Sequence, residues 1–185
     1  MRGGQALSVY RLAFQQSGLK EEMRRSIVQD RTLSEEARQD ALELVESYRE
    51  DPGLLNKASW DVVRLPHADA AACQLALRQI EAAVRLDPDN GLLLNTKGVA
   101  HYRLGRYKDC LATLTCAAKL NTKVYKKPLD SDLAFLAMSQ YRLGQRDEAR
   151  TTLTRLRQAM KAPGTTPSEE DQGFLREAEA LIGAQ

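Results

Sequence analysis

The residue types best suited to chemistry in this chain are two histidines and three cysteines. His67 and Asp69 lie two residues apart, a spacing too common to indicate a metal site, and Asp69 is better explained as the N-cap of a following helix. Cys110 and Cys116 fall about 240° apart around one predicted helix, so they cannot coordinate a single ion and are expected to pack. The sequence therefore predicts no metal site.

Catalytic motifs are likewise missing from the sequence. It contains no phosphate-binding Gly-rich loop, and no strand is predicted that could present a nucleophile elbow. Acidic runs such as Glu21-Glu22 and Glu35-Glu36 fall in first helical turns or on solvated faces, and His101 is expected to pack against the partner helix of its own hairpin. We therefore predict a protein that is not an enzyme and that needs no cofactor.

Composition narrows the class of protein further. Of 185 residues, 43% are hydrophobic and 28% are charged, which is typical of a folded globular chain. The net charge of +2 supplies no basic field that would favour nucleic acid. Three cysteines fit no disulfide framework, and no apolar run reaches membrane-spanning length. We expect a cytoplasmic protein without a membrane partner or a small-molecule substrate.

Apolar residues follow helical spacing nearly everywhere, and the chain repeats itself from residue 53 onward. Arg64-Leu65-Pro66, Arg103-Leu104-Gly105 and Arg142-Leu143-Gly144 recur with a period of 39 residues. Each triplet ends one amphipathic helix and precedes another, and Gly105 and Gly144 suit a left-handed helix end. Three helical hairpins are therefore predicted.

The second hairpin resembles the tetratricopeptide repeat (TPR) family, whose unit is a helix-turn-helix of about 34 residues. The positions that match the family's pattern of large, small and aromatic residues are Leu94, Gly98, Tyr102, Gly105, Tyr107, Leu114, Ala117 and Leu120. Lys97, Cys110 and Thr122 depart from that pattern. The resemblance implies an all-α fold, a right-handed superhelical array of hairpins with a concave ligand-binding surface.

The expected organisation has three parts. Residues 1–51 form N-terminal capping helices, residues 52–162 form the hairpins (52–88, 89–125 and 129–162), and residues 163–185 form a linker and a C-terminal capping helix. Ser168 and Asp171 are a capping box for that last helix. The whole chain also resembles the repeat segment of large bacterial multidomain proteins with Ser/Thr kinase or WD40 modules. As an alternative function, that resemblance implies a regulatory segment of a larger bacterial signalling protein.

One face of the first helices is expected to stay free, because a different stripe, Leu55, Ala58, Ser59 and Val62, packs inside the first hairpin. The residues predicted to line the concave groove are Asn56, Trp60, Val63, Arg64, Asn95, Val99, Tyr102, Arg103, Met138, Tyr141 and Arg142. Aromatic anchors beside an arginine row favour a protein or peptide partner, acidic or phosphorylated. In the alternative interpretation, the arginines bind acids of neighbouring helices and the asparagines bond between repeats.

A second basic feature follows the second hairpin. Lys119, Lys123, Lys126 and Lys127 surround Tyr125 in what is expected to be an extended connection. A solvated linker explains such a lysine run, while lysines with one aromatic also suit RNA. The alternative function from this class is a nucleic-acid-binding helical repeat.

Overall fold

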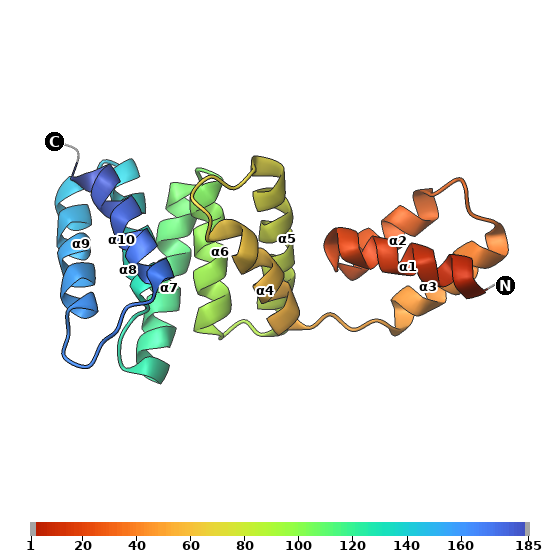
Figure 1. Ribbon diagram of the computed structural model, residues 1–185, viewed down its shortest axis with the longest axis horizontal. Coiled ribbons are helices and arrows are strands. Elements are labelled where there is room, and N and C mark those ends of the chain that lie inside the picture. The colour runs from red at the N-terminus through yellow and green to blue at the C-terminus, as the bar shows by residue number, and fades with distance from the viewer. Residues whose placement is uncertain (1–2, 184–185) are drawn as a thin grey trace.

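The computed structural model describes residues 3–183, and this part of the chain is all-α, with no strand (Figure 1). Its ten helices are α1 (Gly3–Ser17), α2 (Lys20–Gln29), α3 (Glu35–Ser47), α4 (Pro52–Val63), α5 (Ala70–Leu86), α6 (Gly91–Arg103), α7 (Tyr107–Tyr125), α8 (Asp130–Arg142), α9 (Arg146–Met160) and α10 (Glu169–Ile182). Among these described helices, none has the length and apolar character that crossing a membrane requires. The predicted segments 1–51 and 163–185 include positions 1, 2, 184 and 185, which lie outside the described residues.

The helix starts are encoded by local capping residues. Asp69 accepts a hydrogen bond from the backbone N–H of Ala72, which confirms it as the N-cap of α5. Ser34 caps α3 in the same way, and Ser168 and Asp171 form the expected capping box of α10. Each side chain satisfies a helical N–H that has no partner within the helix.

Three pairs of neighbouring helices, α4–α5, α6–α7 and α8–α9, pack as hairpins in chain order. Gly105 and Gly144 both adopt left-handed φ angles, 71° and 81°. The N–H of the residue after each glycine bonds back into the preceding helix, from Arg106 to His101 and from Gln145 to Gln140, both at 2.9 Å. The second and third hairpins therefore share one turn geometry, as their glycines indicated.

The side chains that pack inside the first hairpin differ from those predicted. Leu55 and Ser59 are buried, and the Ser59 hydroxyl donates to the Ala76 carbonyl at 2.9 Å. Ala58, however, is exposed, and Val63 is completely buried. The buried stripe of α4 is rotated toward Val63 because α4 packs against α6 as well as α5.

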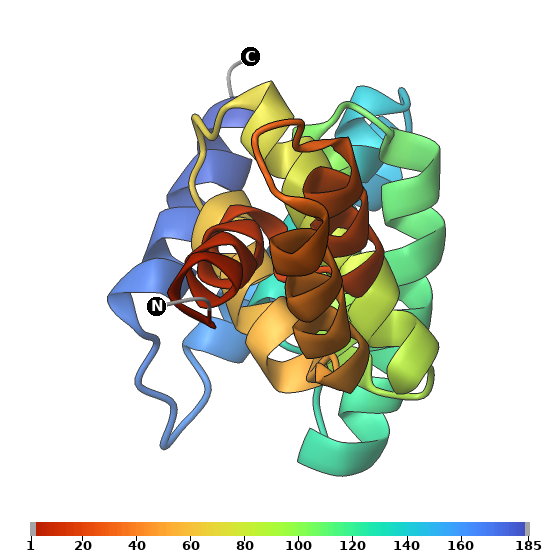
Figure 2. The ribbon, with the colours of Figure 1, turned by 90° about the vertical axis from the view of Figure 1, so that its right-hand side faces the viewer.

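The first three helices form a separate group, which we call the N-terminal helical group (residues 3–47). Met23, Ile27 and Val45 are fully buried in a hydrophobic cluster of its own. Figures 1 and 2 show the group beside the α5 end of the hairpins, joined to them by an extended segment that runs into α4. These helices were predicted to cap the first hairpin, but they pack chiefly on one another, since three short amphipathic helices can bury their own apolar stripes.

Two further expectations need correction. The lysine-rich segment is not an extended connection: α7 continues through Tyr125, so Lys119 and Lys123 lie on its last turns, and Lys126 ends it in a left-handed conformation. Cys116 was expected to pack, but it is exposed, whereas Cys110 is fully buried.

Candidate interaction face

The helices α4, α6 and α8 lie side by side and form a surface that we call the first-helix face. Three of the residues predicted to line a groove here, Val63, Val99 and Met138, have no exposed surface. They are core residues rather than partner contacts, because the hairpins pack on one another along this stripe. Their assignment to a binding groove was wrong.

The C-terminal helix α10 covers much of the first-helix face. As expected, it packs on the last hairpin, mainly against α8 and less against α9 (Figure 1). It also contacts α4, through Glu170 and Phe174. Phe174 of α10 is 4% exposed, with its ring 5.8 Å from that of Trp60 and 5.2 Å from that of Phe135. Both contacts are edge-on, the arrangement that aromatic rings prefer.

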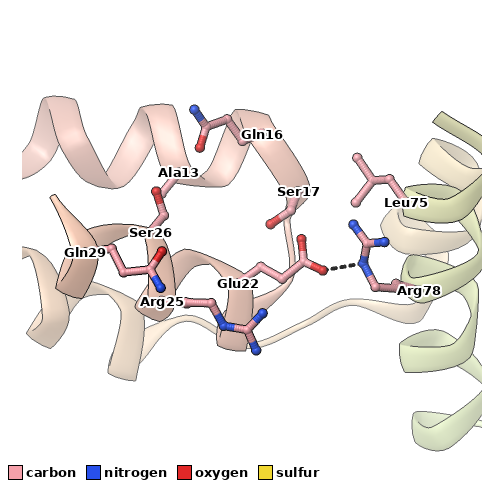
Figure 3. A pocket seen from close by; sticks show the side chains of 9 residues that line it. All are labelled: Ala13, Gln16, Ser17, Glu22, Arg25, Ser26, Gln29, Leu75 and Arg78. Atoms are coloured by element: carbon pink, nitrogen blue, oxygen red, sulfur yellow. Dashed lines mark hydrogen bonds and ion pairs between the residues drawn. The ribbon is translucent and has the colours of Figure 1, made fainter. Parts of the chain in front are cut away.

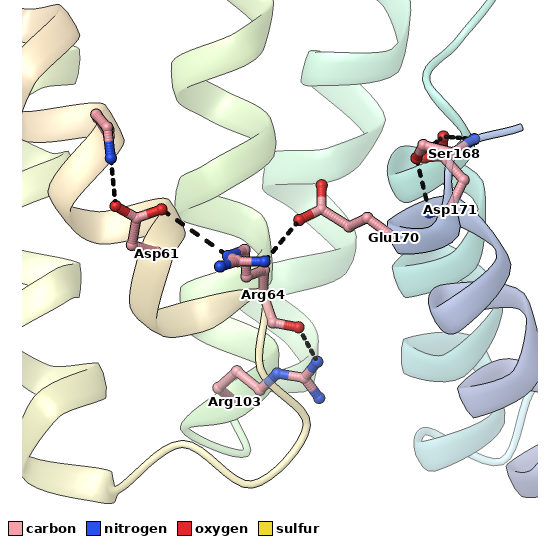
Figure 4. Close-up of polar contacts among 7 residues, drawn as sticks. Asp61, Arg64, Arg103, Ser168, Glu170 and Asp171 are labelled. Carbon is pink, nitrogen blue, oxygen red and sulfur yellow. Dashed lines mark hydrogen bonds and ion pairs between the residues drawn. The ribbon is translucent and has the colours of Figure 1, made fainter.

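Two arginines of the predicted row pair with acids of α10. Arg103 contacts both carboxylate oxygens of Glu177, with its second nitrogen 2.9 Å from Oε2. Arg64 lies 3.4 Å from Glu170, with Asp61 on its other side at 3.9 Å (Figure 4). Arginine and carboxylate make forked pairs of this kind readily. For these two arginines, the alternative interpretation, that they bind acids of a neighbouring helix, is confirmed.

Arg103 is also part of the hairpin packing. Its Nε donates to the Val63 carbonyl at 2.8 Å, and its guanidinium lies 5.0 Å from the centre of the Phe135 ring. The Arg103 side chain is only 5% exposed. It therefore joins the end of α4 to α10. Removing one partner of a buried ion pair strongly destabilises the folded protein.

The third arginine, Arg142, is exposed, and the buried Tyr102 below it contributes to the core. Desolvation raises the pKa of the Tyr102 hydroxyl, while a hydrogen bond with Arg142 lowers it. The Tyr102 ring stands 5.2 Å from that of Phe135, and Tyr141 is half-buried beside Arg146. The arginine row thus ends in a residue that α10 does not cover.

Asn95 belongs to a buried polar network between the second and third hairpins. Its amide donates to Asp132 Oδ1 at 2.7 Å, and the Asn121 amide donates to Asp132 Oδ2 at 3.0 Å. Asp132 is fully buried; desolvation raises the pKa of its carboxyl, against the lowering effect of these donors and of the Leu129 N–H. The predicted bond between repeats is confirmed for Asn95. Asp132 and Asn121 were missed, because in the sequence they resemble an ordinary first-turn acid and a polar residue near a helix end.

Two clefts lie away from the first-helix face. One, of about 520 Å³, opens between the N-terminal helical group and α5, where Glu22 bonds to Arg78 at 2.5 Å (Figure 3). The other, of about 640 Å³, lies over α7, α8 and α9 and is flanked by Lys119, Lys123 and Arg155. Two of the four predicted lysines, Lys119 and Lys123, therefore line a surface cleft of the helices.

Two of the remaining reactive groups, Cys110 and His101, are buried. Burial raises the pKa of the Cys110 thiol to about 12, which leaves it protonated at neutral pH. Desolvation lowers the pKa of His101, whose Nδ1 has no hydrogen-bond partner among the described residues. Within residues 3–183 no group of three or more His, Cys, Asp or Glu residues is placed to hold a metal ion. The first-helix face, in contrast, is a surface that holds an acidic helix, α10.

Comparisons with models of known protein families and with curated proteins gave no match.

Proposed function

We propose that this chain is a non-catalytic interaction module of the TPR type, which acts as a scaffold for a protein partner. In this proposal the three hairpins form a right-handed superhelical array, and the first-helix face is its concave groove. The period of 39 residues and the shared glycine turns of the second and third hairpins support it. Repeated hairpins that stack in one orientation align equivalent side chains into a continuous binding surface.

The preferred partner segment is an acidic amphipathic helix. One observation carries this: the first-helix face already holds such a helix, α10, through Phe174 between two aromatic rings and through Glu170 and Glu177 on two arginines. Glu170, Phe174 and Glu177 are spaced i, i+4 and i+7, so they share one side of the helix. A partner helix with an aromatic residue between two such acids would present the same groups.

A partner must then compete with α10. An occupant on the same chain acts at a high effective concentration, which lowers the apparent affinity of any free helix. The segment between α9 and α10 includes Gly164 with a φ of 77° and two prolines, Pro163 and Pro167, and it contributes little to the hydrophobic core. Release of α10 would therefore open the groove without unfolding a hairpin.

The test uses a fluorescently labelled peptide of residues 168–183 and a chain carrying Glu170→Lys and Glu177→Lys. Two lysines opposite Arg64 and Arg103 should repel α10, so the labelled peptide should bind this chain at least about tenfold more tightly than the wild type, measured by fluorescence anisotropy. The matched control carries two reversals on an exposed face of α3, Asp40→Lys and Glu43→Lys, and should behave as the wild type.

A peptide with Phe174→Ala should lose most of its binding to the opened chain, because the ring fills the site between Trp60 and Phe135. Equal binding of the unmodified peptide to the wild-type and the double-lysine chain would show that α10 does not occupy the peptide's site. The proposed groove would then be wrong.

A further inference from the structure

A pocket of about 410 Å³ remains beside α10, at the end of the first-helix face opposite Arg103. It lies between α4, the N-terminal halves of α6 and α8, the segment just before α8, and the first turn of α10. Trp60, Leu92 and Leu129 supply apolar walls, and the volume is within the range of small-ligand pockets. The sequence indicated a basic groove, but this end of the face has the opposite charge.

Three acids line the pocket against one cation. Glu170 is paired with Arg64, and Asp171 accepts a hydrogen bond from the Ser168 hydroxyl at 2.6 Å. Asp130 Oδ1 accepts no hydrogen bond from the described residues. Burial raises the pKa of the Asp130 carboxyl, the charge of Lys127 lowers it and that of Asp171 raises it. Negative charge therefore exceeds positive charge among the lining residues, and one oxygen of Asp130 is unpaired.

Buried acceptors point to a missing donor. Asp130 is only 9% exposed, and its Oδ1 has no hydrogen-bond partner among the described residues. Asn56, on α4, has a buried Oδ1 in the same condition. An unsatisfied buried acceptor destabilises a protein, and natural proteins leave few of them. Both residues line the pocket, so a ligand that brings N–H donors and a positive charge would meet the Asn56 and Asp130 side chains there.

We propose that this pocket binds a guanidinium group, as carried by an arginine side chain. The group offers several donors in one plane, which suits acceptors on separate helices, and it stacks on aromatic rings such as that of Trp60. The site is independent of the proposed groove function, since it takes a ligand of opposite charge and uses α10 in its docked position. A bound guanidinium close to Glu170 and Asp171 would hold α10 more firmly in place.

Trp60 gives a direct readout, because it is the only tryptophan of the chain and lines the pocket. Titration of the intact protein with Nα-acetyl-arginine amide should produce a saturable change in Trp60 fluorescence. The neutral citrulline analogue, nearly identical in shape, should not. Asp130→Asn should weaken binding at least about tenfold, and Asn56→Asp should strengthen it. Asp40→Asn, an exposed change on α3, is the control and should bind as the wild type.

Several results would overturn the site: no saturable change with the arginine amide, equal binding of the citrulline analogue, or an unchanged affinity in Asp130→Asn. Far-UV circular dichroism verifies the fold, and Asn56→Asp keeps the test decisive should Asp130→Asn fail to fold. The same titration with agmatine, a free guanidinium amine, identifies the source of the ligand. Binding equal to that of the arginine amide assigns recognition to the guanidinium alone, whereas tighter binding of the amide assigns it to a peptide.

Discussion

The N-terminal helical group and α10 flank the same hairpins but are attached to them in opposite ways. α10 contributes Phe174, Ala178 and Ile182 to the hydrophobic cluster of the hairpins. The N-terminal helical group contributes one buried residue, Leu19, to that cluster, and most of its other buried apolar side chains belong to its own cluster. Its polar links to α5 are the Gln79 amide on the Ser17 carbonyl, at 2.7 Å, and the Arg78–Glu22 pair.

The difference follows from the number of helices in each region. A single amphipathic helix cannot cover its own apolar stripe, so α10 is stable only when docked on a complementary surface. Three helices can cover one another, as the burial of Met23, Ile27 and Val45 shows. Both regions were expected to shield an end of the array, but only the single helix depends on the hairpins for its burial.

The largest effect is expected from Phe174→Ala. Removing a buried phenylalanine side chain destabilises a protein by about 3–5 kcal/mol, and here it also releases α10. The midpoint of urea unfolding followed by Trp60 fluorescence should fall accordingly. Phe14→Ala is the control; this ring is 39% exposed in α1 and should leave the Trp60 midpoint unchanged. A Phe174→Ala chain with a normal midpoint would contradict the role of Phe174 in holding α10 on the hairpins.

Ile27→Ala tests the independence of the N-terminal helical group. Ile27 is fully buried in the separate cluster, so the substitution should cost about 2–4 kcal/mol within that group alone. Hydrogen exchange should show lost protection in α2 and α3, while the Trp60 unfolding midpoint stays at its wild-type value. A shift of both readouts together would mean that the chain unfolds as one unit, and the contrast between the two regions would disappear.

Two of the arginine–glutamate pairs that join the flanking regions to the hairpins, Arg103–Glu177 and Arg78–Glu22, should differ in strength. Arg103→Met leaves Glu177 without its partner and removes the bond to the Val63 carbonyl, so we expect a loss of about 2–3 kcal/mol. Arg78→Met breaks a pair whose arginine side chain is 50% exposed, and should cost less than about 0.5 kcal/mol. Denaturant titrations of both variants measure the two losses, and equal values would contradict the comparison.

Much of the fold could be predicted from the sequence because local signals encode it. Asp69, Ser34 and Ser168 are capping residues in the sequence and cap helices in the structure. The period of the arginine triplets and the turn glycines indicated the second and third hairpins. The packing direction of α10 had no such signal, because its apolar stripe shows that it docks but not on which surface.

The candidate site was predicted less well, for the same reason. The sequence placed Arg64 and Arg103 on a common face, but their partners Glu170 and Glu177 are distant in the chain, and no local signal pairs them with these arginines. Val63, Val99 and Met138 share the helical spacing of an exposed stripe, and only the stacking of neighbouring hairpins buries them. Contacts between hairpins depend on helix rotation, which the periodicity of one helix does not determine.

The last predicted effect is a pH dependence of the stability of the hairpins. Both histidines lie there, and burial lowers the pKa of His101 below its ordinary value of 6.5. As pH falls through 6.5 the unfolded chain binds a proton that the folded chain does not, so the free energy of unfolding decreases, by at most about 1.4 kcal/mol per pH unit. Above that pH the stability contributed by neutral His101 is fully present.

His101→Phe should therefore reduce the change in the urea midpoint, followed by Trp60 fluorescence, between pH 7 and 5. Substitution of the exposed His67 by Phe should not reduce it. Hydrogen-exchange protection in α2 and α3 should be the same in the wild type and His101→Phe at each pH, and a difference there would show that the two regions are coupled more strongly than their contacts indicate.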